Sequence, residues 1–242
     1  MTHDFDRDYW DAHWQAAGSA DGSLTVHPYL AVETAALVPG TALEAGCGEG
    51  AEALWLAAHG WTVTAVDISA EALDGAAARS TDARYADRVT WVRADLGTWE
   101  PDGAFDLVST HYAHAAGAQL DLYERLAGWV APGGTLLVVR HRAHDHEQHA
   151  SGTSLHHDAT PSATEHRHDP AEPAHDHEHD HVHGTRPTSA TVTAQQVRER
   201  FEHLGWSVVT AAEPVRTVEA DGGRQVPLHD VVIRAVRPST AP

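Results

Sequence analysis

Apolar residues along the chain follow two periodicities that alternate in a regular way. Short apolar runs with β-branched residues are each followed by a stretch with helical spacing, and glycine or proline separates many of them. The predicted strands cover residues 41–44, 61–66, 89–94, 105–110 and 135–140, and the predicted helices cover residues 30–37, 51–59, 70–78 and 119–130. Strands that alternate with helices indicate an α/β domain with a mainly parallel sheet.

The C-terminal part predicts a different ending. Thr193 and Gln196 form a capping box for a helix that ends at Gly205. Residues 206–211 and 230–236 have the composition of strands, joined by a long hairpin that turns near residues 221–223. The expected fold is therefore a Rossmann-like, doubly wound, mostly parallel seven-stranded sheet with an antiparallel terminal hairpin.

Composition divides the chain into four parts. We expect an N-terminal helical lid in residues 1–40, an α/β core in residues 41–140, a histidine-rich insertion in residues 141–189, and residues 190–242 that complete the same domain. In the first part, Trp10 and Trp14 share a helix face because they are four residues apart. They either pack on the edge of the domain or cover a cofactor cleft, and both can hold.

Charge and cysteine content exclude some classes of function. The net charge is −19, from 16 basic and 35 acidic residues, so a nucleic-acid partner is not expected. Cys47 is the only cysteine, which rules out an intrachain disulfide and indicates a reducing compartment. The start is acidic rather than signal-like, and no apolar run is long enough for a membrane span. We therefore expect a cytoplasmic protein with no membrane contact.

A glycine-rich turn follows the first strand of the core. Between that strand and the next helix, the chain reads Glu44-Ala-Gly46-Cys-Gly48-Glu-Gly50. Gly46, Gly48 and Ala51 satisfy the dinucleotide fingerprint Gly-x-Gly-x-x-Gly/Ala. The same segment also fits Asp/Glu-x-Gly-x-Gly-x-Gly, the turn of class I S-adenosylmethionine-dependent methyltransferases. The turn alone leaves both cofactor classes open.

Acidic residues at the ends of the next two strands distinguish these classes. Asp67 ends the second strand, where a carboxylate can accept hydrogen bonds from both ribose hydroxyls in either class. Asp95 ends the third strand, where the methyltransferase pattern needs an acid for the adenine amino group and a dinucleotide fold does not. Asp95 and the terminal hairpin both favour the methyltransferase pattern over a nicotinamide-dependent oxidoreductase.

Residues 4–140 and 190–237 resemble a small bacterial class I methyltransferase, with the tellurite-resistance and thiopurine-methyltransferase-like enzymes as the nearest subgroup. The resemblance rests on the glycine turn and on the motifs Trp10-x-x-x-Trp14, Trp55-Leu-Ala, Val63-Thr-Ala-Val-Asp67-Ile-Ser, Ala94-Asp95-Leu and Ala131-Pro-Gly-Gly134. It implies the class I methyltransferase fold and S-adenosylmethionine as cofactor. Ala51 and Glu52 depart from the family's usual residues after the turn, which puts a substrate role for that helix in doubt.

The resemblance also implies cofactor contacts by position. Glu44, Gly46, Cys47 and Gly48 would cradle the methionine part, with Cys47 as a small packing residue rather than a nucleophile. The other implied contacts are Asp67 and Ile68 for the ribose, Asp95 and Leu96 for the adenine, Thr110 at the end of the fourth strand, and Trp10 and Trp14 as the cover.

Three residues near the predicted cleft are candidates for catalysis. Methyl transfer needs a nucleophile aligned with an activated methyl group in a site that excludes water. A thiolate, a selenol or a metalloid oxyanion can react without a base, whereas an oxygen or nitrogen nucleophile could use His111 or His114 as general base. The simpler interpretation of each histidine is a plain role in the cleft wall. Arg140, together with His141, could orient an anionic substrate.

The insertion is unusually rich in histidine. Thirteen of the 21 histidines lie in residues 141–183, and few apolar residues are available for packing. Alternating histidines predict binding of Zn²⁺, Ni²⁺ or a similar divalent ion by His175, His177, His179, His181 and His183. The simpler interpretation is a weakly structured surface loop.

The leading hypothesis is a methyltransferase acting on a small molecule, such as a thiol or metalloid. The alternatives are a metal-binding or metal-sensing protein that uses the fold as a scaffold, and a nicotinamide-dependent oxidoreductase.

Overall fold

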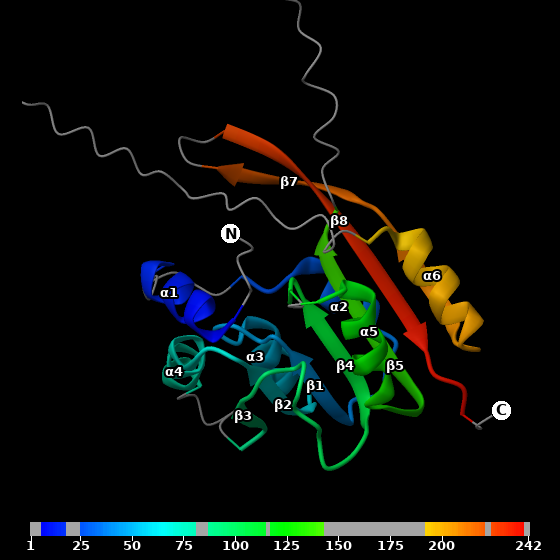
Figure 1. The fold of residues 1–242 in the computed structure, drawn as a ribbon, viewed down its shortest axis with the longest axis horizontal. Coiled ribbons are helices and arrows are strands. Elements are labelled where there is room, and N and C mark those ends of the chain that lie inside the picture. The colour runs from blue at the N-terminus through cyan, green and yellow to red at the C-terminus, as the bar shows by residue number, and fades with distance from the viewer. Residues whose placement is uncertain are drawn as a thin grey trace, which may run out of the picture. The chain divides into compact units, whose positions relative to one another are not determined.

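Helices and strands alternate along most of the chain (Figure 1). The computed structural model describes residues 6–17, 25–80, 87–114, 117–142, 192–220 and 224–239. The helices are α1 Arg7–Ala17, α2 Pro28–Thr34, α3 Ala51–Ala58, α4 Ala70–Arg79, α5 Gln119–Gly128 and α6 Ala194–His203. The strands are β1 Thr41–Ala45, β2 Thr62–Asp67, β3 Val89–Arg93, β4 Phe105–His111, β5 Val130–His141, β6 Ser207–Ala212, β7 Val215–Ala220 and β8 Arg224–Val236.

Seven of the strands form a continuous path in the order β3-β2-β1-β4-β5-β8-β6. Neighbours from β3 to β5 are parallel, and β8 runs antiparallel to both β5 and β6. This confirms the predicted doubly wound sheet with an antiparallel ending. Strand order reverses between β1 and β4, and ligands of open α/β sheets bind outside the carboxyl ends of strands at such a switch point.

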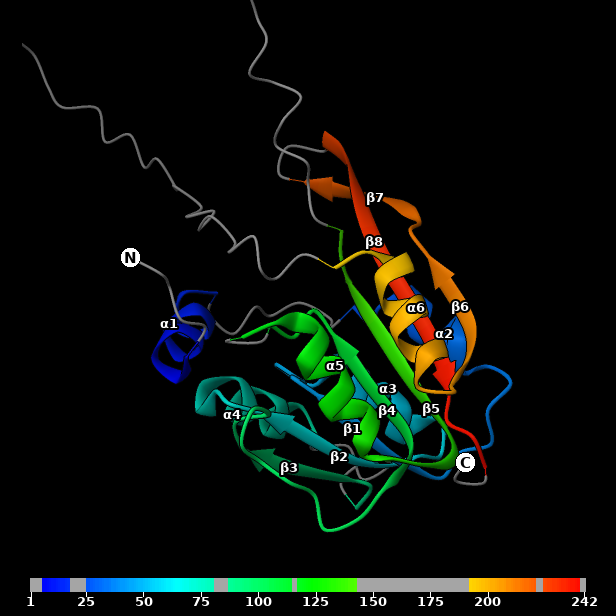
Figure 2. The ribbon, with the colours of Figure 1, turned by 45° about the vertical axis from the view of Figure 1, so that its right-hand side comes forward.

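An eighth strand lies outside this path and was not predicted. Residues 215–220 form β7, which pairs antiparallel with the first part of β8, from Ala220 opposite Arg224 to Val215 opposite His229. The second part of β8, from Asp230 onward, pairs with β5. Figures 1 and 2 show that the β7–β8 hairpin therefore extends past the end of β5 as an arm.

Helices cover both faces of the sheet. On one face, α5 and α6 contribute Leu122, Leu126, Val197 and Phe201 to a core with Val108, Leu136 and Ile233. On the other face, α2, α3 and α4 contribute Leu30, Leu56 and Leu73 to a core with Val63, Leu107 and Val139. Burial of these side chains is the main stabilising contribution to the fold.

Helix ends follow the predicted capping chemistry. The Ser69 side chain accepts a hydrogen bond from the backbone of Ala72, and Thr193 with Gln196 forms the complete capping box. One boundary differs from prediction, because α5 ends at Gly128 and β5 already begins at Val130. Residues 132–134, expected to precede that strand, are part of it and produce a register shift against β4.

None of the helices within the described ranges is long and apolar enough to cross a membrane.

Candidate functional site

The glycine turn folds back onto the end of β2. The backbone N–H groups of Gly46 and Cys47 both donate to the carbonyl oxygen of Val66, at 2.8 and 3.0 Å. Gly48 has a φ of +50°, which a residue with a side chain rarely adopts. This backbone path places the turn at the carboxyl edge of β1, directly before α3.

Asp67 links the glycine turn to the turn after β2. One carboxylate oxygen accepts from the backbone N–H of Gly48 at 2.8 Å, and the other accepts from that of Ser69 at 2.9 Å. Burial raises the pKa of Asp67, and these backbone hydrogen bonds partly offset the increase. A carboxylate has about four lone-pair sites, so each oxygen keeps acceptor capacity for a ligand hydroxyl.

Helix α1 contacts the same region through its aromatic face. A Cβ on Gly48 would lie 2.8 Å from Cζ2 of Trp14, so the indole ring lies directly against the turn. The Trp10 ring stacks on His114, which follows β4, with the ring centroids 5.9 Å apart. The two tryptophans thus contact the segments that follow β1 and β4, on either side of the switch point.

Asp11 fixes α1 to the start of α4. Its Oδ1 accepts from the Ser69 hydroxyl at 2.6 Å and from the backbone N–H of Ala70 at 3.0 Å. The Ser69 hydrogen bond, ahead of the opposing effect of burial, lowers the pKa of Asp11. Sequence reasoning missed this residue, since an acid within an acidic helix gives no sign of its partner.

The remaining predicted cofactor residues line the same edge. Asp95 is exposed after β3, and its Oδ1 accepts from the backbone N–H of Gly97 at 2.8 Å. Leu96 is partly buried and packs against the core. Ile68 follows β2, next to Asp67. Thr110 is buried, and its hydroxyl has no hydrogen-bond partner in the part of the chain that the structure describes.

Cys47 is buried inside the glycine turn. Burial raises the pKa of its thiol well above the usual value, and the negative charges of Asp67 and Glu44 add to this increase. A thiol in this environment stays protonated, in keeping with a packing role.

Glu44 forms a buried pair with His111. Its Oε1 lies 2.8 Å from Nδ1 of His111, and its Oε2 accepts from the Ser109 hydroxyl. Burial alone would lower the pKa of His111, but the charge and hydrogen bond of Glu44 and the charge of Glu52 prevail, so the net change is an increase. The carboxylate predicted to cradle a cofactor thus also orients an imidazole ring at the end of β4.

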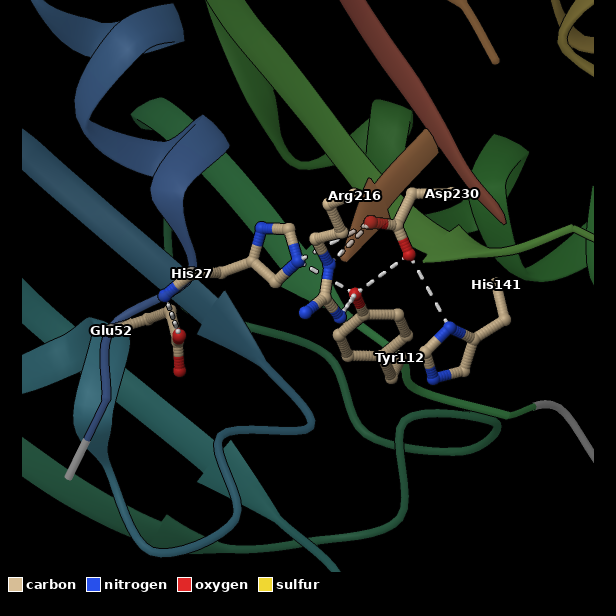
Figure 3. A network of polar contacts seen from close by, with 6 residues as sticks. All are labelled: His27, Glu52, Tyr112, His141, Arg216 and Asp230. Atoms are coloured by element: carbon tan, nitrogen blue, oxygen red, sulfur yellow. Dashed lines mark hydrogen bonds and ion pairs between the residues drawn. The ribbon is translucent and has the colours of Figure 1, made fainter. Parts of the chain in front are cut away.

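A second polar network lies beside this pair and is centred on Asp230 (Figure 3). Asp230 is fully buried where β8 passes from β7 to β5. Arg216 donates from Nε to its Oδ2 at 2.6 Å, and the Tyr112 hydroxyl donates to its Oδ1 at 3.1 Å. Nδ1 of His141 lies 3.3 Å from the same Oδ1. One carboxylate therefore joins the segment after β4, the end of β5 and the β7–β8 arm.

Tyr112 connects this network to the N-terminal segment. Its hydroxyl lies 2.6 Å from Nε2 of His27 and accepts from Nη2 of Arg216 at 3.1 Å. The backbone N–H of His27 donates to Glu52 at 2.9 Å. Tyr112 is the one non-glycine residue of the described ranges with a positive φ, at +61°, a conformation that concentrates at functional sites.

Arg140 lies apart from this network. Adjacent strand residues point to opposite faces of a sheet. His141 stacks on Tyr112, whereas Arg140 is buried and hydrogen-bonded to Tyr123 of α5. The structure therefore brings His111, Tyr112 and His141 together and leaves Arg140 on the α5 face.

The five histidines of the predicted metal site, residues 175–183, lie outside the described residues. Within the described ranges, no cluster of three or more potential metal ligands occurs.

Comparison with known proteins decides between the two interpretations of the turn. Residues 42–134 match the family model for a methyltransferase domain. The chain also superposes on TehB from Haemophilus influenzae over 96% of its length and 66% of that chain, with a TM-score of 0.60 at 13% identity. Residues 42–134 are thus a methyltransferase domain. The expected class I methyltransferase fold is confirmed.

The curated relatives of the methyltransferase domain match it only in part. An uncharacterised methyltransferase of Mycobacterium tuberculosis is 42% identical over 99 residues, which are 40% of this chain and 48% of that protein. A probable thiol methyltransferase of Arabidopsis thaliana is 28% identical over 135 residues, 54% of this chain and 60% of that protein. The chain spans about half the length of the curated relatives it matches.

The polar network around Asp230 includes residues that sequence reasoning did not select. His27 was not selected as a site residue, and Glu52 was noted only as a departure from the family pattern. Arg216 and Asp230 were not considered. One signal was available for Asp230, because an acid that begins an otherwise apolar run, Val231-Val232-Ile233, requires a partner once it is buried.

Proposed function

We propose that the protein transfers a methyl group from S-adenosylmethionine to a small nucleophilic molecule. The observation that carries this proposal is the Asp67 carboxylate, which is tied to the backbone of Gly48 while the Trp14 ring covers the same glycine. A Cβ at Gly48 would collide with that ring, so this position holds bare backbone close to an aromatic cover. Such a turn fits a cofactor that lies on backbone N–H groups and offers two ribose hydroxyls.

The residues have separate roles in this proposal. The backbone of Gly46 and Gly48 approaches the methionine part, Asp67 accepts from the ribose, and Asp95 with Leu96 frames the adenine. Trp14 and Trp10 exclude water from above. When bound, S-adenosylmethionine supplies a methyl group that its sulfonium has already activated. The protein then has to hold the nucleophile in line and keep the site dry.

A small, soft acceptor such as a thiol or a metalloid fits best. A relative of similar sequence is named as a probable thiol methyltransferase, which supports sulfur as the attacking atom. His111 and His114 are the candidate bases, and Arg140 is the candidate for orienting an anionic acceptor. The burial of Arg140 beside Tyr123 makes it the weakest of the three.

Release of S-adenosylhomocysteine in the presence of single acceptors tests this function. The acceptors are 2-mercaptoethanol, hydrosulfide, thiocyanate, iodide and tellurite, each assayed with the full chain. We expect turnover with at least one sulfur acceptor, with loss of turnover in Asp67→Ala and unchanged turnover in the exposed control Asp102→Ala. Equal turnover of wild type and Asp67→Ala would refute the assigned role of Asp67, and no turnover with any acceptor would refute the proposed soft substrate.

Metal binding by residues 175–183 is a second candidate function that rests on sequence alone. The alternating histidines of this segment are suited to Ni²⁺ or Zn²⁺. Titration of the chelator-treated protein with each ion tests it, with the five histidines replaced by alanine as the control. Metal-dependent turnover would make the segment regulatory, and equal heats for both proteins would exclude these histidines as the ligands.

A further inference from the structure

Two buried imidazole nitrogens near the end of β4 are without a hydrogen-bond partner in the part of the chain that the structure describes. Nε2 of His111 and Nδ1 of His27 are both buried, and neither has a hydrogen-bond partner among the described residues. The rings belong to distant segments, yet their centroids lie 5.9 Å apart. Buried polar atoms in proteins are nearly always hydrogen-bonded, so two such atoms together indicate a place where a polar ligand group binds.

Glu44 determines what His111 offers to that ligand. The carboxylate contacts Nδ1 at 2.8 Å, so Nδ1 carries a hydrogen and donates it. Nε2 of the neutral ring is therefore an acceptor. Its proton affinity is increased, because the Glu44 charge stabilises the imidazolium form.

The Asp230 network determines what His27 offers. The Tyr112 hydroxyl has one hydrogen, and the Asp230 carboxylate at 3.1 Å is a stronger acceptor for it than a neutral imidazole. The Tyr112 oxygen then accepts, both from Arg216 and from Nε2 of His27 at 2.6 Å. His27 therefore carries its hydrogen on Nε2, and its Nδ1 is also an acceptor.

We propose that His27 and His111 form the binding site for the methyl acceptor and select a nucleophile that arrives with a hydrogen on the attacking atom, such as an alkyl thiol. This inference rests on the proposed function and extends it to the substrate class. Two acceptors on neighbouring rings fit a donor group, whereas a proton-free anion such as thiocyanate or iodide offers them no hydrogen. Glu44, Tyr112 and Asp230 act as positioning residues, since each fixes a tautomer without reaching the ligand.

The proton balance assigns the two rings different roles. As the sulfur–hydrogen bond of the thiol breaks, the proton moves to Nε2 of His111, and the sulfur electron pair bonds to the methyl carbon. The bond between that carbon and the sulfonium breaks, which leaves S-adenosylhomocysteine, a methyl thioether and an imidazolium paired with Glu44. His27 keeps its tautomer throughout and orients the incoming group.

Charges around each ring agree with this division. His111 faces Glu44 on β1, Glu52 on α3 and His27, and the carboxylates outweigh burial so that its pKa rises. His27 faces His111, Arg216, Asp230 and His141, and burial with the neighbouring positive groups lowers its pKa to about 4. His111 is thus the stronger base, and His27 stays neutral at neutral pH.

Nitrogen-15 imidazole spectra of the full chain test the tautomers without any turnover. His27→Gln and His111→Gln identify the two sets of signals. At pH 7 we expect His27 to carry its hydrogen on Nε2. In Tyr112→Phe we expect a mixture of both tautomers of His27, whereas the nearby control Tyr29→Phe should keep the hydrogen on Nε2. We also expect 2-mercaptoethanol to shift Nδ1 of His27 and Nε2 of His111. A hydrogen on Nδ1 of His27, or no shift of either nitrogen, would overturn the proposal.

Kinetics provide the second test. In His111→Gln, we expect kcat/KM for 2-mercaptoethanol to fall roughly 10²–10⁴-fold, the usual range for loss of a general base. The rise in rate with pH through the His111 pKa should disappear with it. Thiocyanate turnover should change much less, and the exposed control His203→Gln should resemble wild type for both acceptors.

Titration with S-adenosylmethionine distinguishes failure of the proposed methyl transfer from failure of the proposed acceptor site. Unchanged S-adenosylmethionine binding by His111→Gln assigns its defect to the acceptor site. Failure of the wild type to bind the cofactor would refute the proposed function, and with it the methyl transfer described here. Equal losses for thiol and thiocyanate would refute the selection for a hydrogen-bearing nucleophile alone.

Discussion

Replacing Asp230 with alanine should destabilise the protein strongly, although the residue lies far from the glycine turn in sequence. Its side chain is 0% exposed and pairs with Arg216, which is 26% exposed. Removal of one partner from a buried ion pair typically costs about 3–5 kcal/mol, because the other charge stays buried without compensation. Arg216 keeps some contact with water, so we expect the low end, about 3 kcal/mol.

Urea unfolding followed by tryptophan fluorescence measures this cost. The exposed control Asp102→Ala should match wild type. Combining Asp230→Ala with Arg216→Met should cost less than the two single changes added together, by about 2 kcal/mol, because the double variant leaves no unpaired charge. A loss below about 1 kcal/mol for Asp230→Ala, or full additivity, would refute the view that this pair joins the arm to the sheet.

Two further predictions concern the contact of helix α1 with the glycine turn and the effect of pH. In Gly48→Ala, a Cβ at φ +50° would lie 2.8 Å from the Trp14 ring, so helix α1 must move. We expect S-adenosylmethionine affinity to fall at least about tenfold, a cost of roughly 1.4 kcal/mol, measured by calorimetry, whereas Gly103→Ala has open space and should bind normally. His27 has a pKa of about 4 in the folded protein against an ordinary 6.5. Between these pH values the unfolded chain therefore binds more protons at His27 than the folded protein does. The contribution of His27 to the free energy of unfolding thus falls as the pH falls from 6.5 to 4. Urea midpoints between pH 4 and 7 should show this slope in wild type and a shallower one in His27→Gln, and equal slopes would contradict it.

The fold was predictable from sequence where apolar runs are unambiguous. The strands of the parallel half are buried on both faces, so residues 62–67 and 105–111 read as continuous β-rich segments. Strand β7 was missed because Val215-Arg216-Thr217-Val218 has two polar residues in succession and lies within a segment expected to be a hairpin connection. Residues 215–220 form a strand because they pair with β8, and their composition alone does not predict this.

The site was predictable only where function depends on neighbours in sequence. The glycine turn and Asp67 belong to local strand–turn segments, so spacing alone located them. His27, Tyr112 and Asp230 come from three distant segments, and a one-residue change of register between β5 and β8 would separate Asp230 from His141. Such a constellation is a property of the tertiary structure and cannot be read from spacing.

Calorimetric titration of the chelator-treated full chain with S-adenosylmethionine and S-adenosylhomocysteine tests the central claim most directly. The account predicts binding of both with dissociation constants between roughly 1 and 100 µM, as is common for enzyme ligands, and loss of binding in Asp67→Ala. Binding that survives in Asp67→Ala would contradict the role of the carboxylate that joins the two turns. Absence of binding to wild type would contradict the proposed methyl transfer itself.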